Sequence, residues 1–238
     1  MSFICEEKVN NAFVSAIIVS AGSSSRMGGV NKQFLEIGGI PVIAHSIKAF
    51  MNCNLINEIL VVTREEDIST IKQLAEKYGF SKVSAIVSGG ETRQRSVING
   101  LKMISDKADY IAIHDGARPL VTEKIIKDTL AVAIKTGAAT TGVKVIDTIK
   151  CVDDKNVILS TPDRAFLRAV QTPQIFNKKL YLDAVLNVKN SDNFTDDCKL
   201  IEAFGHKVTI VDGDYENIKI TTPNDVVVAE AYFSKRGK

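Results

Sequence analysis

The chain alternates short, β-branched apolar runs with longer segments whose apolar residues recur at helical spacing. The clearest runs, each followed by a polar turn and then an amphipathic segment, are residues 13–19, 57–63, 82–87 and 109–114. Repeated strand–helix units favour an open sheet with helices on both faces, and their crossovers are almost always right-handed. The sequence therefore predicts an α/β, Rossmann-like, doubly wound and mostly parallel sheet in a single domain that spans residues 1–238.

Helix signals accompany the predicted strands along the whole chain. Helices are expected at residues 65–78, 92–104, 178–188 and 224–233. Thr122 and Thr195 are suited to cap two further helices, because a threonine oxygen can accept a hydrogen bond from a free backbone N–H of the first turn.

Polar segments rich in small residues follow three of the predicted strands, at residues 20–33, 88–91 and 115–119. In an open parallel sheet, ligands bind beyond the carboxyl ends of the strands. These segments are far apart in the sequence, but we expect them to converge on one cleft.

The first segment is Ser-Ala-Gly-Ser-Ser-Ser-Arg-Met-Gly-Gly-Val-Asn-Lys-Gln. Small residues let the backbone curl close to a ligand with its N–H groups turned inward. Arg26 and Lys32 add positive charge, so the segment indicates phosphate binding, with a plain strand–helix connection as the alternative. It is not a P-loop, because Met27 stands where the second glycine is required. It is not a dinucleotide fingerprint either, because Ser24 occupies the second glycine position.

Cations gather near the same predicted edge of the sheet, and later segments add more: Arg26, Lys32, Arg93, Arg95, Arg118, Arg164 and Lys219. One such residue is usually a solvated surface charge. Several beside small-residue loops suit phosphoryl or nucleotidyl transfer, which requires neutralisation of charge on phosphorus oxygens. Asp115 is a candidate ligand for Mg²⁺, although a lone aspartate at a strand end is usually a turn or cap residue. His114 should point away from the cleft as a structural residue.

Charge and hydropathy exclude several classes of partner. The chain has 30 basic and 28 acidic side chains, so bulk charge gives no support for a nucleic-acid partner. No apolar run approaches the ~18 residues needed to span a membrane, and the first residues do not have the pattern of a signal peptide. The four cysteines are widely spaced, as in proteins of a reducing compartment. We expect a cytoplasmic protein that binds neither nucleic acid nor membrane.

The strand–helix alternation stops after Gly137. Residues 138–149 form a long β-branched stretch, residues 153–156 have turn composition, and residues 157–161 can form a short second strand. The sequence therefore predicts a β-hairpin without a covering helix. Because exposed strand edges usually find a partner, we expect a β-arm at about residues 143–166 that packs on a second subunit of a homodimer. Folding back onto its own domain is the alternative.

Short motifs that occur in order along the chain resemble those of a known family. They are Ala21-Gly22-x-Ser24-x-Arg26-Met27, Lys32-Gln33-Phe34, Gly89-Gly90-Glu91-x-Arg93, Ser96-Val97, His114-Asp115-Gly116-Ala117-Arg118-Pro119, Asp147-Thr148, Gln171-Thr172-Pro173-Gln174, Thr195-Asp196-Asp197 and Asn217-Ile218-Lys219-Ile220-Thr221. From about Ala16 to Phe233, the chain resembles the 2-C-methyl-D-erythritol 4-phosphate cytidylyltransferases of the non-mevalonate isoprenoid pathway. The resemblance implies CTP and methylerythritol phosphate as substrates, Mg²⁺ as cofactor, and a cytidine diphosphate alcohol and pyrophosphate as products.

The resemblance also implies roles for individual residues. Those implied to be catalytic are Arg26, Lys32, Arg164 and Lys219. Those implied to bind CTP are Ser20, Ala21, Gly22, Ser23, Ser24, Gly90, Glu91, Arg93, Ser96, Asp115 and Gly116. Those implied to bind the acceptor are Asp115, Arg118, Thr148, Arg164, Thr172, Thr195 and Lys219, with Asp115 also at the metal. In the family, the arm carries the arginine that matches Arg164 to the neighbouring subunit's site. Ser24 and Asn31 depart from the family, where glycine and proline are frequent.

The implied reaction explains why the sequence offers no convincing general base. A phosphate monoester has a second pKa of ~6 and is largely dianionic at neutral pH, so it can attack without losing a proton. Two unit charges ~4 Å apart repel each other by about 4 kcal/mol at an effective dielectric constant of 20. The cations and Mg²⁺ are the groups that can offset this repulsion between acceptor and triphosphate.

The sequence leaves three alternative functions to be weighed. Ribitol 5-phosphate cytidylyltransferase shares the fold, the first loop and the mechanism, although Asp147-Thr148 and residues 195–197 favour methylerythritol phosphate. A nucleotide-binding protein without turnover is a second alternative. An NAD-dependent oxidoreductase would be compatible with the strand–helix pattern, but the missing dinucleotide fingerprint argues against it.

Overall fold

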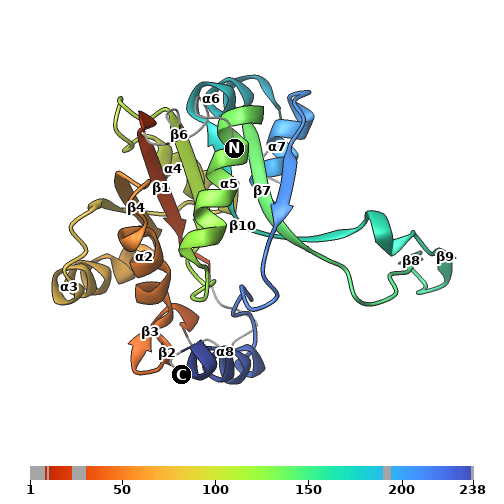
Figure 1. Ribbon diagram of the computed structural model, residues 1–238, viewed down its shortest axis with the longest axis horizontal. Helices are drawn as coiled ribbons and strands as arrows, with labels where there is room; N and C mark the ends of the chain where they lie inside the picture. The colour runs from red at the N-terminus through yellow and green to blue at the C-terminus, as the bar shows by residue number, and fades with distance from the viewer. Residues whose placement is uncertain (1–8, 10, 23–30, 190–193, 237–238) are drawn as a thin grey trace.

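The computed structural model describes residues 9, 11–22, 31–189 and 194–236. Its centre is a seven-stranded sheet in the order β11-β7-β10-β6-β1-β4-β5 (Figure 1). The strands are β1 (Val14–Val19), β4 (Glu58–Thr63), β5 (Val83–Ser88), β6 (Tyr110–Asp115), β7 (Ala138–Lys144), β10 (Arg168–Asn177) and β11 (Thr209–Asp212). Only β10 runs antiparallel to its neighbours, β6 and β7. The predicted mostly parallel α/β sheet is confirmed.

Helices cover both faces of this sheet, because alternate residues of the central strands point to opposite sides. The helices are α2 (Val42–Asn52), α3 (Ile68–Tyr78), α4 (Arg93–Leu101), α5 (Glu123–Thr136), α6 (Lys178–Asn187), α7 (Asp197–Ala203) and α8 (Pro223–Arg236). On β1, Ala16 and Ile18 join the core beneath α2, α3 and α5, whereas Ile17 joins the core beneath α4, α6 and α7.

The chain winds in two directions from the centre of the sheet. From β1 it proceeds to β4 and β5 on one side, and then crosses to β6 on the other side of β1. The carboxyl ends of β1 and β6 therefore flank the point at which the winding direction reverses. Such a switch point is where open α/β sheets bind ligands.

A small unit at this end of the sheet supports the segment that carries Lys219. It consists of α8 packed on the hairpin of β2 (Glu36–Ile37) and β3 (Ile40–Pro41), around buried Ile37 and Ile220. The two-residue hairpin turn is Gly38-Gly39, with φ of 58° and 73°, a conformation that glycine adopts without strain. Ile220 N donates to the carbonyl of Ala117 at 2.8 Å, which ties the Lys219 segment to the loop after β6.

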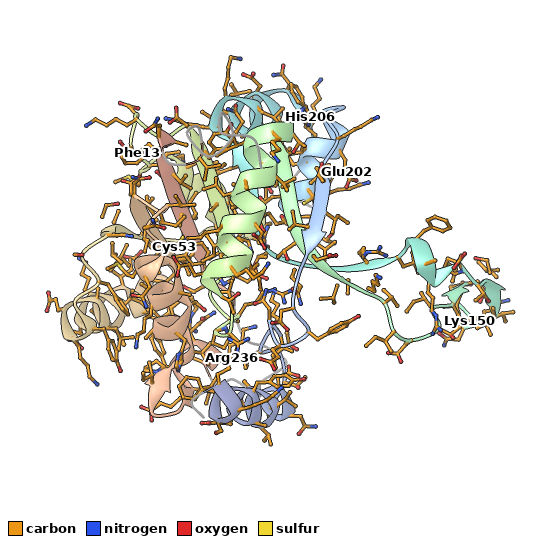
Figure 2. The ribbon with its side chains drawn as sticks, viewed as in Figure 1. Phe13, Cys53, Lys150, Glu202, His206 and Arg236 are labelled. Carbon is orange, nitrogen blue, oxygen red and sulfur yellow. The ribbon has the colours of Figure 1, made fainter. Side chains whose placement is uncertain are left out.

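The predicted β-arm extends away from the sheet between β7 and β10 (Figures 1 and 2). Its hairpin consists of β8 (Cys151–Val152) and β9 (Ile158–Ser160), joined through a turn at residues 153–156. Apolar side chains of the arm are exposed, with 65% of Ile146, 67% of Leu159 and 85% of Phe166 accessible. The arm does not fold back on its own domain, and its packing on a second subunit stays a prediction.

Several predicted element boundaries are wrong. The strand expected to reach Ile149 ends at Lys144, because the chain leaves β10 there and loses its pairing partner. The helix expected to be capped at Thr195 begins at Asp197, because the Asp196 carboxylate accepts from Lys199 N at 3.0 Å. The Thr122 cap of α5 is confirmed by its bond from Ile125 N. Within the described ranges, no helix has the length and apolar character to cross a membrane.

Candidate active site

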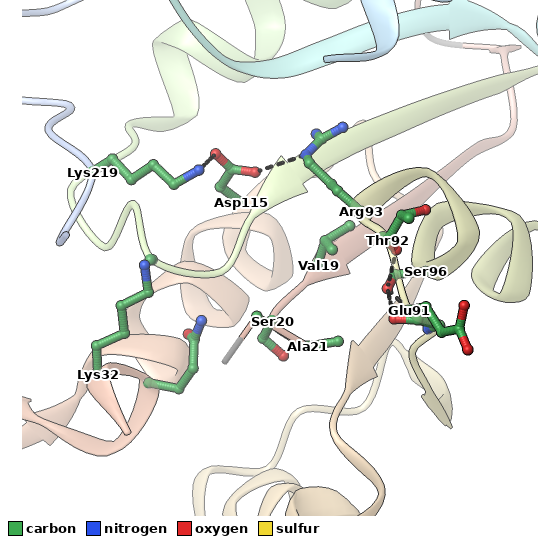
Figure 3. Close-up of a pocket in the computed structure, with 14 residues that line it drawn as sticks. Val19, Ser20, Ala21, Lys32, Glu91, Thr92, Arg93, Ser96, Asp115 and Lys219 are labelled. Carbon is green, nitrogen blue, oxygen red and sulfur yellow. Dashed lines mark hydrogen bonds and ion pairs between the residues drawn. The ribbon is translucent and has the colours of Figure 1, made fainter. Parts of the chain in front are cut away.

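A pocket of about 370 Å³ lies at the switch point, a size within the range of small-molecule sites (Figure 3). It is lined by residues from all three polar segments and from the Lys219 segment: Val19, Ser20, Ala21, Gly22, Lys32, Gln33, Gly90, Glu91, Thr92, Arg93, Ser96, Asp115, Ala117 and Lys219. The three segments therefore converge on one cleft, as the strand order requires.

The loop after β1 begins from a fixed position. Ser20 donates twice to the carbonyl of Val62 on β4, from its backbone N at 2.7 Å and its Oγ at 2.9 Å. Ala21 and Gly22 then face the pocket without side chains that would fill it. The predicted residues Ser23, Ser24 and Arg26 lie outside the described residues.

A side-chain clamp holds the short 3-10 turn η2 (Lys32–Phe34), which brings Lys32 to the pocket. Asn31 Oδ1 accepts from Gln33 N at 3.1 Å, and Asn31 Nδ2 donates to Asp67 at 2.9 Å. Arg64 in turn donates to Asp67 from Nε at 2.7 Å. The clamp gives Asn31 a structural role at the position where it departs from the family.

The loop after β5 closes the other side of the pocket and leads into α4. Thr92 caps the helix by accepting from Arg95 N at 3.1 Å, and Ser96 Oγ accepts from Gly90 N at 3.0 Å. A Cβ on Gly90 would lie 2.5 Å from the Cβ of Arg95, so only glycine fits the loop where it folds back against the helix. Glu91 lies at the pocket's edge and is exposed.

Asp115, the last residue of β6, lies among three cations. Lys219 Nζ is 2.7 Å from Asp115 Oδ2, Arg93 Nε is 3.5 Å from Oδ1, and Arg118 Nε is 3.8 Å from Oδ2. Burial alone would raise the pKa of this carboxyl, but Lys219, Arg93 and Arg118 outweigh burial and hold the pKa well below its ordinary value. Asp115 is therefore ionised at any physiological pH, and Figure 3 shows it between Lys219 and Arg93.

His114 and Thr172 fix the backbone of Asp115 from behind. Burial lowers the pKa of His114 to about 3, so its ring is neutral, and its Nε2 lies 3.3 Å from the carbonyl of Arg118. A carbonyl only accepts, so Nε2 carries the proton and Nδ1 accepts from Thr172 Oγ1 at 3.0 Å. Thr172 Oγ1 itself accepts from Asp115 N at 3.0 Å. The prediction that His114 is structural agrees with this geometry.

A second pocket of about 230 Å³ shares one wall with the first. It is lined by Arg93, Asp115, Arg118, Val170, Gln171, Thr172, Gln174, Thr195, Asp196 and Lys219. Arg93, Asp115 and Lys219 occur in the lining of both pockets, so they form the wall between them. Arg118 faces only the second pocket and is held by its bond from Nη1 to the carbonyl of Asn217 at 2.7 Å.

Some predicted site residues lie elsewhere. Thr148 and Arg164 belong to the arm and line neither pocket of the described chain, and Arg164 Nη1 donates to the carbonyl of Ile146 at 2.7 Å. Gly116 packs against other residues instead of lining a pocket, because a Cβ there would lie 2.7 Å from Ile43 Cδ1.

Sequence reasoning missed residues that orient the site. The fully buried Asp197 accepts from Arg93 Nη1 at 2.5 Å, and Gln33 and Gln174 line the pockets. The sequence contains Asp197 only as part of the motif Thr195-Asp196-Asp197. Nothing in the sequence indicates that it contacts Arg93, which is 104 residues away.

Known proteins resemble this chain along nearly its whole length. The family described as "IspD: 2-C-methyl-D-erythritol 4-phosphate cytidylyltransferase" matches residues 14–235. The chain is 48% identical over 225 residues to the protein of that name from Caldanaerobacter subterraneus subsp. tengcongensis, covering 93% of this chain and 99% of the relative. It is 45% identical over 230 residues to the one from Alkaliphilus oremlandii, covering 95% of this chain and 98% of the relative.

Solved structures agree with the relatives found by sequence. The structure of 4-diphosphocytidyl-2C-methyl-D-erythritol synthase from Anaerococcus prevotii is similar with a TM-score of 0.84 and 35% identity, over 96% of this chain and 99% of that one. The structure of 2-C-methyl-D-erythritol 4-phosphate cytidylyltransferase from Thermus thermophilus is similar with a TM-score of 0.75 and 30% identity, over 92% of this chain and 98% of that one. The chain therefore belongs to the 2-C-methyl-D-erythritol 4-phosphate cytidylyltransferase family.

Proposed function

We propose that this chain transfers the cytidylyl group of CTP to 2-C-methyl-D-erythritol 4-phosphate, releasing pyrophosphate and forming 4-diphosphocytidyl-2-C-methyl-D-erythritol. The observation that supports this most directly is the wall of Arg93, Asp115 and Lys219 between two adjoining pockets. Two phosphorylated substrates must meet at one phosphorus atom, and cations in a wall shared by two pockets would neutralise charge at such a meeting point.

The first pocket is the proposed CTP site. The loop of residues 90–96 offers backbone groups and Ser96 to the cytosine base, and the loop after β1 receives the triphosphate beside Lys32. Arg26 is proposed to join Lys32 there. The second pocket, with Arg118 and Thr195, is the proposed site for the acceptor phosphate.

In the proposed reaction, an oxygen of the acceptor phosphate attacks the α-phosphorus of CTP. The bond from that phosphorus to the bridging α–β oxygen breaks, and its electrons leave with pyrophosphate. The acceptor is already a dianion at neutral pH, so no proton has to be removed. Lys219 and the other cations lower the barrier by stabilising the charge on the five-coordinate phosphorus.

A divalent cation, Mg²⁺, is part of the proposal. Mg²⁺ is usually held by one or two carboxylates together with substrate phosphates, and Asp115 supplies an ionised carboxylate at the shared wall. Among the described residues, no three His, Cys, Asp or Glu side chains lie together as a metal site, so the phosphates would complete the coordination. When bound, Mg²⁺ neutralises charge on the triphosphate.

The arm is proposed to join two chains as a homodimer. Its exposed apolar residues, among them Leu159 and Phe166, would be covered by the second copy. Arg164, on the arm's 3-10 turn η4 (Arg164–Phe166), and Thr148 would then reach the partner's acceptor pocket. The free thiols of Cys53, Cys151 and Cys198 are compatible with a reducing compartment, and the cytoplasm is the proposed location.

The test is pyrophosphate release from CTP with each candidate acceptor. We expect turnover with methylerythritol phosphate, loss of turnover when a chelator removes divalent cations, and recovery when Mg²⁺ is added. Faster turnover with ribitol 5-phosphate would replace the proposed acceptor. CTP binding without pyrophosphate release from either acceptor would instead favour a nucleotide-binding protein without turnover.

A further inference from the structure

Arg93 makes different contacts with the two edges of its guanidinium group. Its Nε faces Asp115 Oδ1 at 3.5 Å, whereas its Nη1 donates to Asp197 Oδ2 at 2.5 Å. The contact with Asp197 is the shorter, and the Arg93 side chain is 24% exposed while that of Asp197 is fully buried. The guanidinium is therefore held from the side that faces away from Asp115.

Asp197 is itself fixed by groups from other elements. Tyr181 on α6 donates its hydroxyl to Asp197 Oδ1 at 2.5 Å, and Asp197 N donates to Gln174 Oε1 on β10 at 3.0 Å. Burial and the neighbouring Asp197 raise the pKa of Tyr181 well above its ordinary value, so the hydroxyl keeps the proton that it donates. Both carboxylate oxygens are thus committed, one to Tyr181 and one to Arg93.

Asp197 anchors the Arg93 guanidinium on the side of the second pocket. Gln174, Thr195 and Asp196 surround Asp197 in sequence or by hydrogen bonds, and all three line the second pocket, whereas none of them lines the first. The anchor consequently sets where the Arg93 charge lies along the wall that both pockets share.

The anchor also limits how Arg93 can pair with Asp115. A guanidinium released from Asp197 could turn its fork onto the Asp115 carboxylate and form a bidentate pair. Such a pair would compete with Lys219, whose Nζ lies 2.7 Å from Asp115 Oδ2. It would also direct the N–H groups of Arg93 onto Asp115 instead of leaving them to donate to a phosphate.

We propose that Asp197, held by the hydroxyl of Tyr181, is a positioning residue that keeps the Arg93 guanidinium at the acceptor pocket and away from a bidentate pair with Asp115. Because it concerns how the acceptor phosphate is held, this inference rests on the proposed function. Asp197 is absent from the linings of both described pockets, so it acts only through Arg93.

The test uses Asp197→Asn, which keeps the shape of the side chain and removes its charge. An asparagine has one acceptor oxygen, so it cannot accept from both Tyr181 and Arg93 as the carboxylate does. We expect the KM for the acceptor at saturating CTP to rise at least tenfold. A purely structural defect would reduce the number of folded sites, which lowers kcat and leaves KM unchanged.

Three further variants, one of them a double substitution, test whether the effect passes through Arg93. Arg93→Gln alone should raise the acceptor KM strongly, and adding Asp197→Asn to it should change that KM by less than twofold. Tyr181→Phe removes a single hydroxyl and should raise the KM about threefold. Asp183→Asn, on the same helix as Tyr181 but half-buried and paired with Lys179, is the matched control and should behave as the wild type.

Additive effects of Arg93→Gln and Asp197→Asn, or a fall in kcat at unchanged KM, would overturn the inference. If Asp197→Asn does not fold, an unchanged KM for the acceptor in Tyr181→Phe would overturn the inference instead. Calorimetric titration of the acceptor separates this inference from the proposed function. Absence of turnover in the wild type would count against the function, whereas weaker acceptor binding by Asp197→Asn would still support the positioning role.

Discussion

At the scale of single residues, the site depends on a charged carboxylate, that of Asp115, next in the chain to a neutral imidazole, that of His114. Asp115 is ionised because three cations surround it, and His114 is neutral because burial disfavours its charged form. The neutral ring accepts from Thr172, whose oxygen accepts from the backbone of Asp115. Protonation of His114 would therefore remove the acceptor of the Thr172 hydroxyl, whose oxygen accepts from Asp115 N.

The buried histidine predicts how stability depends on pH. An unfolded chain protonates His114 below its ordinary pKa of 6.5, whereas the folded chain does so only near its pKa of about 3. The unfolded state thus binds more protons between these values, and stability falls as pH decreases through this window. By pH 5 the loss from this residue is about 2 kcal/mol. Urea unfolding of the wild type and His114→Gln at pH 7 and pH 5 measures it.

The comparison between variants isolates the histidine, because carboxylates that titrate in the same range remain in both proteins. His114→Gln should lose less stability than the wild type between pH 7 and pH 5. Equal losses in the two proteins would show that His114 is not the group responsible.

At the scale of elements, the sequence predicts strands and helices well and their junctions poorly. Apolar periodicity of 2 and of 3.6 residues identifies β1, β4, β5 and β6 and the helices after them, because burial on a sheet imposes those periods. The order of the strands then predicts that Ser20, Gly90 and Asp115 meet. The Asn31–Asp67 clamp could not be predicted, because its partners are 36 residues apart and meet only after folding.

The clamp gives a prediction at this scale. Asn31→Ala removes both the cap of η2 and the bond to Asp67, at a cost of about 1 kcal/mol, which corresponds to about a fivefold loss of kcat/KM if the turn places Lys32. Thr122→Ala removes a comparable cap from α5, away from the pockets, and should lower Tm by a similar amount without lowering kcat/KM. Equal loss of kcat/KM in the two variants would contradict a positioning role for the clamp.

At the scale of the whole molecule, one chain holds most but not all of the predicted site. Lys32, Arg93, Asp115 and Lys219 line pockets within the body, whereas Arg164 lies on an arm that extends away from it (Figure 1). The sequence predicts the arm, because its hairpin lacks a helical partner. The sequence does not predict the direction in which the arm points, because that direction depends on how the chain bends between β7 and β10.

A mixture of two damaged proteins tests whether the arm completes the site of a second copy. Lys32→Ala should lower kcat about 10²-fold by removing a cation from the transition state, and Arg164→Ala should raise the KM for the acceptor while sparing CTP binding. In a symmetric dimer with shared sites, a mixed pair has one site with Lys32 from one chain and Arg164 from the other. Random re-association of equal amounts should therefore restore about a quarter of the wild-type sites.

The mixture is assayed at low acceptor concentration, where each variant alone is slow. If both residues served the site of their own chain, every chain in the mixture would lack one of them and no activity would return. Each variant incubated with an equal amount of itself is the control for dilution and handling. A fully active wild-type monomer at high dilution would contradict the shared site independently, because its Arg164 would then have no partner to serve.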